Sequence, residues 1–191
     1  FTSNRSGGLE IWRANRDGSD AIQLTQGGRN ENPHVSPDGR SIIYRAGLRP
    51  DGRLMRMASD GQDPVILTDH FADWARFSPD SRMIACSYEV DGRTMVALLS
   101  ADGGPPLQIF DIPETANVRL GVRWTPDGKS ITFRDWQNGI WKQELAGGAP
   151  ARLEGLPAEK LFAYAWSRDG KWFAYGRGSI ISDVVLLTSL Q

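Results

Sequence analysis

The amino-acid sequence predicts an all-β protein built from repeated four-stranded antiparallel units, and three observations support this. The chain holds 21 Gly and 11 Pro among 191 residues, about 17% against a usual ~12%, so turns are frequent and long helices are not expected. A Ser-Pro-Asp-Gly phrase recurs four times, and an Asp-Gly phrase recurs between its copies at the same period. An apolar content of 40% with seven Trp is that of a folded chain rather than a disordered one.

The two phrases repeat in step with each other. The first begins every 42 to 47 residues and the second every 42 to 44. Copies of the first are Ser36–Gly39, Ser78–Ser81, Thr125–Gly128 and Ser167–Gly170, and copies of the second begin at Asp17, Asp60, Asp102 and, in degenerate form, Ala146. Two independent phrases with one period are typical of a repeat protein.

The composition of the phrases predicts tight turns. In Ser-Pro-Asp-Gly, Pro presets φ at the second position, Asp suits the third, and Gly accepts the left-handed conformation that follows. This phrase is expected to join the first and second strands of a unit, and Asp-Gly the third and fourth. Ser81 replaces Gly in the second copy, which predicts a more strained turn there.

Large apolar residues keep the same register in every repeat, and they are expected to be buried. The position directly before the first phrase holds Val35, Phe77, Trp124 and Trp166. The position six residues after the start of that phrase holds Ile42, Ile84, Ile131 and Phe173, and the position eight residues after it holds Tyr44, Cys86, Phe133 and Tyr175. The position seven residues after the start of the second phrase holds Leu24, Leu67, Ile109 and Leu153. A step of two between apolar positions is a strand pattern. Cys86 is therefore interpreted as a small buried hydrophobe rather than a reactive thiol.

Each period has the size and content of one β-propeller blade. Taken in order along a single propeller region, residues 1–29 form a partial blade, residues 30–68, 69–112 and 113–156 form complete blades, and residues 157–191 form a blade without its outer strand. About four and a half blades are thus expected. A ring of six or seven needs roughly 258 or 301 residues at this period. The chain also begins with Phe1 rather than Met, so we expect a fragment of such a ring within a longer polypeptide.

Charge and hydropathy exclude two classes of partner. With 22 basic and 23 acidic residues the net charge is −1, so no nucleic-acid binding by this chain is expected. The longest fully apolar run is Met95–Leu99, far short of the ~20 residues of a membrane-spanning helix, so no membrane insertion by this chain is expected. With one cysteine, no internal disulfide can form.

The sequence carries no recognisable catalytic constellation. It lacks a Gly-x-Ser-x-Gly nucleophile elbow, a Gly-x-x-x-x-Gly-Lys-Ser/Thr phosphate loop and a Gly-x-Gly-x-x-Gly dinucleotide loop. The only histidines are His34 and His70, and no zinc-type spacing is present. The Asp residues of the repeated phrases are interpreted as turn formers. We therefore expect no enzyme activity, no cofactor and no metal in this chain.

Candidate binding residues are those that break the repeat. Two residues before each first phrase stand His34, Arg76, Arg123 and Ala165, on the strand face opposite the apolar slot. Three potentially cationic side chains near the propeller axis favour an anion-attracting channel mouth for an acidic peptide or carboxylate. The alternative is that each Arg packs its stem between blades and pairs with a nearby Asp or Glu.

Further candidates lie in segments expected to be loops on the same face. Arg119, Trp74 and Trp136 are candidates for the binding surface, and for each Trp the expected role is an interface anchor or a plug over the channel mouth. Trp12 and Trp141 share one strand position and are expected in the core.

The repeat resembles that of a known family. Ser-Pro-Asp-Gly followed by an Ile-x-Tyr/Phe strand, together with Ile11-Trp12, Asp17-Gly18 and Leu24-Thr25, is similar to the TolB-type, WD-like β-propeller repeat. The C-terminal stretch from Trp166 to Leu187 is similar to the final blade of bacterial regulators in which a Ser/Thr kinase or winged-helix domain precedes the propeller. These resemblances imply a non-catalytic protein-interaction or sensor module within a bacterial signalling protein, with a protein or peptide as its partner.

Two other functions stay open from the sequence. One is a periplasmic TolB-like envelope protein that binds partner proteins. The other is the propeller of a prolyl-oligopeptidase-like peptidase, which would require a hydrolase domain downstream. The resemblance favours a periplasmic or other extracytoplasmic location and leaves the cytoplasm open.

Overall fold

The computed structural model describes residues 1–118, 121–137, 139–156 and 160–179. They form seventeen β-strands, and this described part of the chain contains no α-helix. Accordingly, nothing in these ranges is a helix long and apolar enough to cross a bilayer.

The strands form five sheets that follow one another along the chain, and every pairing is antiparallel. The first sheet contains β1 (Thr2–Ser3), β2 (Glu10–Arg13) and β3 (Ile22–Gln23). The second contains β4 (Asn30–Val35), β5 (Ser41–Ala46), β6 (Arg53–Ala58) and β7 (Val65–Ile66). The third contains β8 (Ala72–Phe77), β9 (Met83–Val90), β10 (Arg93–Ser100) and β11 (Gln108–Phe110). The fourth contains β12 (Arg123–Trp124), β13 (Ser130–Arg134), β14 (Ile140–Glu144) and β15 (Ala151–Arg152), and the fifth β16 (Lys160–Trp166) and β17 (Phe173–Gly178).

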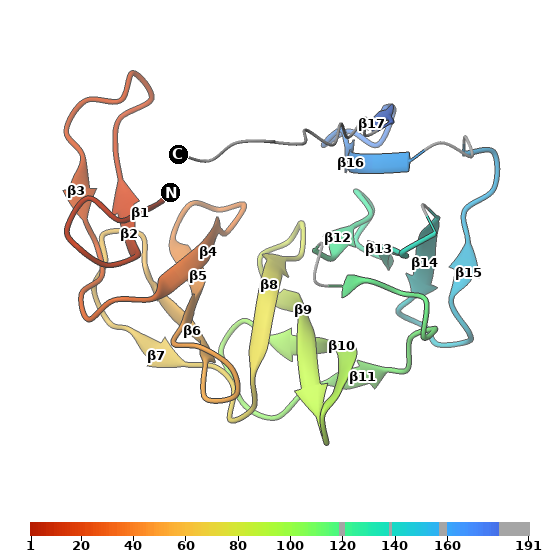
Figure 1. Ribbon diagram of the computed structural model, residues 1–191, viewed down its shortest axis with the longest axis horizontal. Helices are drawn as coiled ribbons and strands as arrows, with labels where there is room; N and C mark the ends of the chain where they lie inside the picture. Colours follow the sequence, from red (N-terminus) through yellow and green to blue (C-terminus); the bar gives the residue numbers. More distant parts are fainter. Residues whose placement is uncertain (119–120, 138, 157–159, 180–191) are drawn as a thin grey trace, which may run out of the picture.

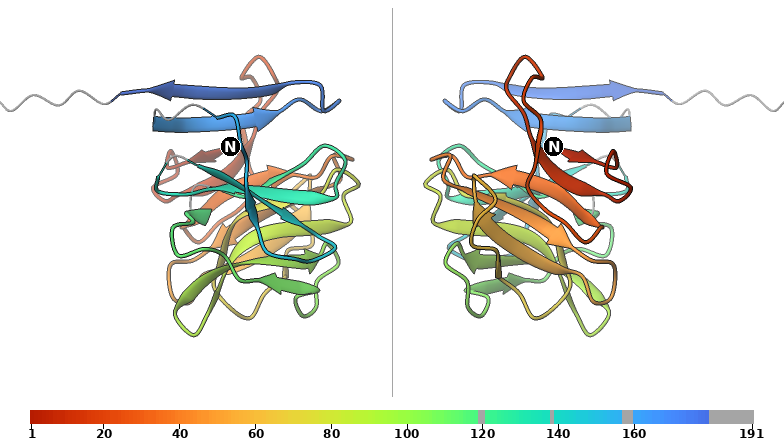
Figure 2. Two further views of the ribbon diagram at one scale, coloured as in Figure 1. Left: turned by 90° about the vertical axis from the view of Figure 1, so that its right-hand side faces the viewer. Right: turned by 90° about the vertical axis from the view of Figure 1, so that its left-hand side faces the viewer.

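The sheets are arranged as blades around a common centre (Figure 1). The first strands of successive sheets, β4, β8, β12 and β16, lie nearest that centre, and the later strands lie further out. In the side views the β16–β17 hairpin lies at one end of the stack of sheets (Figure 2). The predicted all-β propeller of four-stranded antiparallel blades is thus confirmed, whereas its division at residues 68, 112 and 156 stays a prediction.

The repeated phrase forms the expected turn. In the first copy the amide of Gly39 donates to the carbonyl oxygen of Ser36 at 2.8 Å, and Gly39 has φ of 75°. The Ser36 hydroxyl donates to Asp38 Oδ1 at 2.5 Å and accepts from the amide of Ser41 at 3.0 Å. The other three copies repeat these bonds. Ser81 takes φ of 65°, a conformation that favours glycine, which agrees with the predicted strain.

The core consists of separate clusters, each between two consecutive sheets. One cluster, with Tyr44 and Ile42 against Ile11, joins the first and second sheets. The next two join the second to the third sheet and the third to the fourth, and the last, with Tyr164 and Ile140, joins the fourth to the fifth. Burial between blades is the expected source of stability in such a repeat array. Cys86 is fully buried in the second of these clusters, as predicted, and burial raises the pKa of its thiol to about 12.

Several residues expected in the core are more exposed than the repeat predicts. Val35 is 52% exposed, whereas Phe77, at the same repeat position one sheet later, is covered by β4. The first sheet has no described strand on the inner side of β1 that could cover Val35 in the same way. Ile109 is exposed on the outer strand β11. Tyr175 is exposed and Trp166 half-buried, because no described sheet covers the far side of the β16–β17 hairpin.

Trp12 and Trp141, which share one strand position of the repeat, are also only half-buried. The Trp141 indole N–H donates to Asp135 Oδ2 at 3.0 Å, whereas the Trp12 indole nitrogen is buried and has no hydrogen-bond partner in the described structure. Both residues border the core rather than fill it, since they pack at its edge next to polar groups.

Candidate functional site

The predicted channel-mouth residues lie on the innermost strands of three consecutive sheets. His34 lies on β4, Arg76 on β8 and Arg123 on β12. These three strands lie near the centre of the arc in Figure 1. We call these three residues the channel-mouth cluster. Each acts electrostatically on another member, since both arginines lower the pKa of His34 and Arg123 lowers that of Arg76. The structure therefore brings together three residues that are more than forty positions apart in sequence.

His34 is not a cation at neutral pH. Burial, reinforced by Arg76 and Arg123, lowers its pKa to about 4. Its Nδ1 accepts a hydrogen bond from the amide of Phe77 at 3.3 Å, so the neutral ring carries its proton on Nε2. Of the three potentially cationic side chains at the channel mouth, His34 is thus a neutral donor, and the two arginines supply the positive charge.

The two arginines of the cluster have no carboxylate partner in the described part of the chain. Arg76 Nη1 donates to the carbonyl oxygen of Ala75 at 2.8 Å, and Arg123 Nη1 donates to that of Val122 at 3.2 Å. Burial, followed by the charge of Arg123 and opposed by Asp73, lowers the pKa of Arg76 to about 10, so it remains protonated at neutral pH. Among the described residues, neither arginine forms a direct ion pair with an acid, although the charge of Asp73 acts on Arg76. Two positive charges therefore lie together in this described part of the structure.

A backbone irregularity precedes each member of the cluster. The residue two positions earlier has positive φ in each case: 56° at Asn32 in β4, 53° at Trp74 in β8, and 94° at Gly121, which precedes β12. In β4 and β8 the pairing register shifts at this point, which is the mark of a β-bulge. Bulges re-aim the side chains that follow, so they set the direction of His34 and Arg76.

The backbone before β12 has a local reason for its glycine. A Cβ atom on Gly121 would come within 2.8 Å of Arg123 Nη1, because the guanidinium folds back over this residue. Glycine thus serves two purposes here, since it adopts the left-handed conformation and leaves room for the arginine.

The sequence predicted that Trp74 lies in a loop, but it lies within strand β8, where it is half-buried. A bulky aromatic residue with positive φ is a rare conformation that the surroundings must hold in place. Arg119, the other loop candidate, lies outside the described residues.

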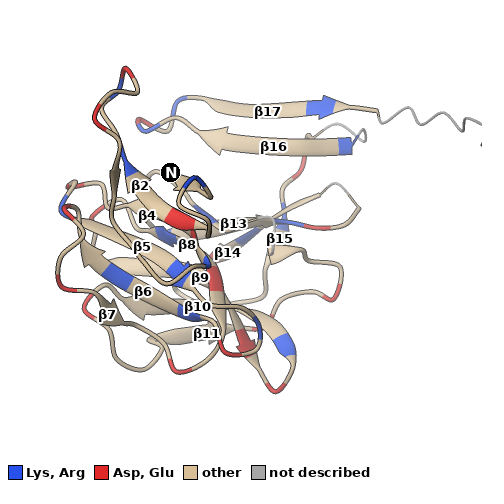
Figure 3. Cartoon of the chain, turned by 60° about the vertical axis from the view of Figure 1, so that its left-hand side comes forward, with Lys and Arg blue, Asp and Glu red and all other residues tan. Residues whose placement is uncertain are grey.

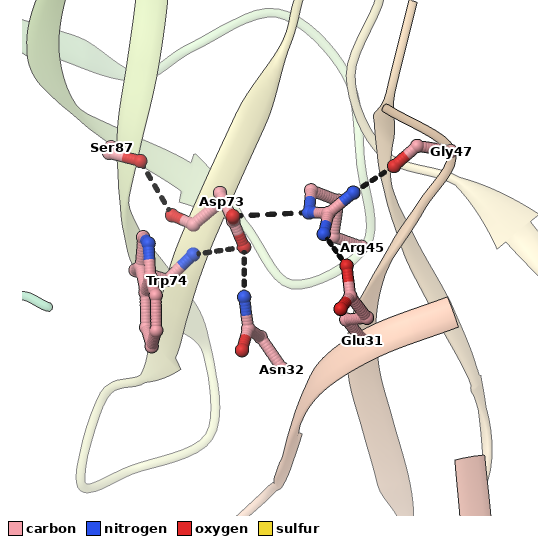
Figure 4. A network of polar contacts seen from close by, with 7 residues as sticks. All are labelled: Glu31, Asn32, Arg45, Gly47, Asp73, Trp74 and Ser87. Carbon is pink, nitrogen blue, oxygen red and sulfur yellow. Dashed lines mark hydrogen bonds and ion pairs between the residues drawn. The ribbon is translucent and has the colours of Figure 1, made fainter. Parts of the chain in front are cut away.

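A buried polar network holds the bulges of β4 and β8 together (Figure 4). Asp73 Oδ1 accepts from Asn32 Nδ2 at 2.8 Å and from the amide of Trp74 at 2.7 Å, and Asp73 Oδ2 pairs with Arg45 Nε at 3.1 Å. Arg45 also pairs with Glu31. The repeat did not point to this network, because the position of Arg45 is not one of the apolar slots and holds Ser87, Arg134 and Gly176 in the other copies.

Trp136 lies apart from the network, on the turn between β13 and β14, and it is 69% exposed. It lines a cavity with Asn117 and Arg93, two residues of segments that the sequence predicts to be loops on the same face. The three members of the channel-mouth cluster do not line this cavity. The structure thus divides the predicted binding residues between two places on the molecule.

Other functional chemistry has little support in the described ranges. They contain no group of three or more His, Cys, Asp or Glu side chains that could hold a metal ion. Basic and acidic residues are interspersed along the chain rather than separated on two sides (Figure 3). Local clusters, and not a global field, must therefore determine what the surface attracts.

Comparison with known proteins agrees with this architecture. A family profile described as TolB β-propeller domain matches residues 1–116. An uncharacterized protein of Agrobacterium fabrum is 27% identical over 136 residues, which cover 65% of this chain and 46% of that protein.

Solved structures show the same fold at low sequence identity. A TolB candidate from Agrobacterium tumefaciens superposes with a TM-score of 0.62 and 24% identity, covering 83% of this chain and 57% of that one. TolB from Acinetobacter baumannii gives 0.70 and 18%, covering 87% and 42%. A chain of the nidogen/laminin complex gives 0.66 and 17%, covering 88% and 64%. The chain thus spans about half the length of the relatives that it matches.

Proposed function

Because the chain belongs to the TolB β-propeller family, we propose that it is a non-catalytic protein-interaction module that takes an acidic segment of a partner protein at the channel-mouth cluster. The fold alone does not set this role, since one propeller type serves many functions. The proposal therefore rests on the chemistry of the cluster.

The observation that carries it is the pair Arg76 and Arg123 without a carboxylate partner in the described structure. Two neighbouring partly buried cations repel each other, and this repulsion is relieved when an anion binds between them. Guanidinium groups bind carboxylates through charge-assisted, often bidentate hydrogen bonds. The Nε2–H of neutral His34 supplies a further donor beside them.

Rigid presentation favours a binding role over a loose surface charge. The bulges at Asn32 and Trp74 are held by the Asp73 network, and Gly121, which has positive φ, leaves room for the Arg123 guanidinium. Preorganised groups lose less entropy on binding. The nidogen/laminin structure, in which a propeller of this fold occurs within a protein complex, supports a protein as the kind of partner.

A peptide-binding experiment tests the proposal. The probe is a fluorescent Asp/Glu-containing peptide, compared with its Asn/Gln counterpart, and the dissociation constant is measured by anisotropy at 50 and 300 mM salt. The double variant Arg76→Gln, Arg123→Gln should bind the acidic peptide roughly tenfold or more weakly, since each charge-assisted hydrogen bond contributes about 1.5–3 kcal/mol. Binding to the parent protein should weaken with salt because charges are screened.

The control must remove the same charge elsewhere. Arg40→Gln, Arg82→Gln also deletes two positive charges, at exposed turn residues that follow the first-phrase turns. It should leave the affinity nearly unchanged. If the two double variants weaken binding equally, the effect is one of net charge and the channel-mouth cluster is not the site.

A further inference from the structure

The cavity beside Trp136 has a volume of about 410 Å³ and lies between β10 and the segment 112–118. Ile112, Pro113, Ala116 and Val118 line its apolar wall. The other lining residues are Trp136, Asn117, Arg93, Thr94 and Glu114. None of these residues belongs to the channel-mouth cluster, so the cavity goes beyond the function proposed above.

Trp136 is presented by a turn that is fixed at both ends. Its amide donates to the carbonyl oxygen of Thr115 at 2.9 Å, which ties the turn to the cavity wall. The Asp135 carboxylate accepts from the amide of Gly139 at 2.6 Å and pairs with Arg152 at 3.6 Å. A Cβ on Gly139 would clash with both of those side chains, so the turn requires glycine there. An exposed tryptophan on such a rigid support has the properties of an interface anchor.

Asn117 supplies an unpaired polar group in the same cavity. The residue is only 3% exposed, yet neither Oδ1 nor Nδ2 of its side chain has a hydrogen-bond partner in the described structure. Its main-chain amide is satisfied, because it donates to the carbonyl oxygen of Arg134 at 2.7 Å. A buried carboxamide without partners is costly, and such groups are usually paired by water or by a ligand. Asn117 lines the cavity with its two polar atoms buried, so a rotation of its side chain would offer one acceptor and two donor hydrogens to a ligand there.

The charges at the rim are close to balanced. Arg93 lies 3.4 Å from Asp111, and both side chains are exposed. Glu114 is the remaining charged residue that lines the cavity. The site therefore lacks the uncompensated positive charge of the channel-mouth cluster, and an acidic ligand is not favoured here.

We propose that this cavity binds an uncharged, extended peptide segment, which places an aliphatic or proline side chain against Trp136 and the Ile112–Pro113 wall and pairs one peptide group with Asn117. A peptide group presents one N–H and one C=O, the complement of a carboxamide. A saccharide also stacks on tryptophan, but it brings many hydroxyl groups, and this cavity is mostly apolar with few free polar partners. A peptide is thus the ligand class that matches both the apolar Ile112–Pro113 wall and the side-chain amide of Asn117.

Titration with a defined probe tests this. The probe is acetyl-Ala-Leu-Pro-Ala-amide at millimolar concentration, with chitotriose as the saccharide comparison. The measurement is the ¹H–¹⁵N spectrum of the protein, in which the Trp136 indole and the Asn117 side-chain amide are assigned by their loss in Trp136→Ala and Asn117→Leu. Saturable shifts of both signals with the peptide, and none with chitotriose, are expected.

Variants and salt separate this site from the channel mouth. Trp136→Ala, followed at the Asn117 signals, should weaken the peptide roughly tenfold or more, and Asn117→Leu, followed at the Trp136 signal, by about three- to tenfold. Trp172→Ala, which removes an equally exposed tryptophan elsewhere, should change nothing. Binding should persist in 300 mM salt and in the Arg76→Gln, Arg123→Gln variant.

Three results would overturn the proposal: no saturable shift with the peptide, binding of chitotriose instead, or full affinity in the Trp136→Ala variant. Because Trp136 is exposed, its replacement leaves the fold intact, so the Trp136→Ala titration decides the matter even if Asn117→Leu does not fold.

Discussion

The indole N–H of Trp124 donates a 2.9 Å hydrogen bond to the main-chain carbonyl oxygen of Arg76. This bond joins β12 to β8, the innermost strands of two neighbouring sheets. Trp124 is otherwise buried among the residues that pack the third sheet on the fourth. The same residue thus holds two blades together and fixes the backbone that carries a channel-mouth arginine.

Replacing Trp124 should therefore be strongly destabilising. Trp124 is 8% exposed, and Trp124→Ala should lower the free energy of unfolding by about 3–5 kcal/mol, as for other large-to-small changes in cores. Trp124→Phe keeps most of the apolar volume and should cost only about 1–3 kcal/mol, chiefly from the lost hydrogen bond between the two strands. Urea unfolding measures both. The matched control is Trp172→Ala, at a residue that is 74% exposed, and an equal loss there would mean that the blade register is wrong.

Ser81→Gly should stabilise the protein by up to about 1 kcal/mol. Ser81 has φ of 65° at a turn position where the other three copies have Gly, and the left-handed conformation costs a non-glycine residue roughly 1–2 kcal/mol. Part of this gain is offset by the greater freedom of Gly in the unfolded chain and by the weak 3.3 Å bond from the amide of Asp38 to Ser81 Oγ. The reverse change Gly128→Ala should destabilise the protein, because Gly128 has φ of 68°. A Cβ atom there would meet only ordinary contacts, so the cost would come from the backbone conformation alone. A melting temperature that falls in Ser81→Gly would contradict the strain argument.

The repeat made the fold and the turns predictable, because phrases at one period report hairpins that depend on local chemistry alone. Burial was predictable only where a neighbouring sheet exists on both sides: Phe77 is buried and Val35 is not, although they occupy the same slot. The slot of His34, Arg76 and Arg123 was visible in the sequence because strand alternation fixes its face.

Neither the protonation state of His34 in the channel-mouth cluster nor the cavity beside Trp136 could be predicted from the sequence repeat. The neutral state of His34 depends on burial and on a hydrogen bond from another sheet. The bulge at Trp74 depends on the side chain of Asp73, which no periodicity marks. Asn117 became a candidate only when the structure showed a buried amide without a partner in the described residues.

Asp73→Ala should be among the most destabilising polar substitutions in the chain. It leaves Asn32 Nδ2 and the amide of Trp74 without an acceptor and removes one of the two carboxylates of the buried Arg45. Loss of one partner from a buried ion pair costs about 3–5 kcal/mol, and here Glu31 retains part of the pairing, so the lower end is expected. The control Asp102→Ala breaks an exposed pair with Arg56 and should have little effect. Comparable unfolding midpoints for the two variants would show that the network in Figure 4 contributes nothing to stability.

Stability should fall as the pH drops from about 6.5 to about 4, and His34 should be a main cause. The folded protein holds the pKa of His34 at about 4, below its ordinary value of 6.5, through burial and the charges of Arg76 and Arg123. Within that window the unfolded chain binds a proton that the folded chain does not, so the free energy of unfolding decreases as the pH falls. The turn carboxylates of Asp38, Asp80 and Asp127 have pKa values below their ordinary 3.8, so their contribution is lost only at still lower pH.

The variant His34→Gln separates this effect from the others. A Gln side chain does not titrate, and its carbonyl oxygen can still accept from the amide of Phe77, so the slope of unfolding free energy against pH between 6.5 and 4.5 should be clearly reduced. The matched control is His70→Gln, because His70 is half-exposed, lies beside Asp69 rather than the arginines, and should leave the slope unchanged. Urea midpoints at pH 7, 6, 5 and 4.5 measure all three proteins. A parent-like slope in His34→Gln would mean that His34 takes up its proton over the same pH range in the folded and unfolded chains, so that burial beside the arginines does not lower its pKa.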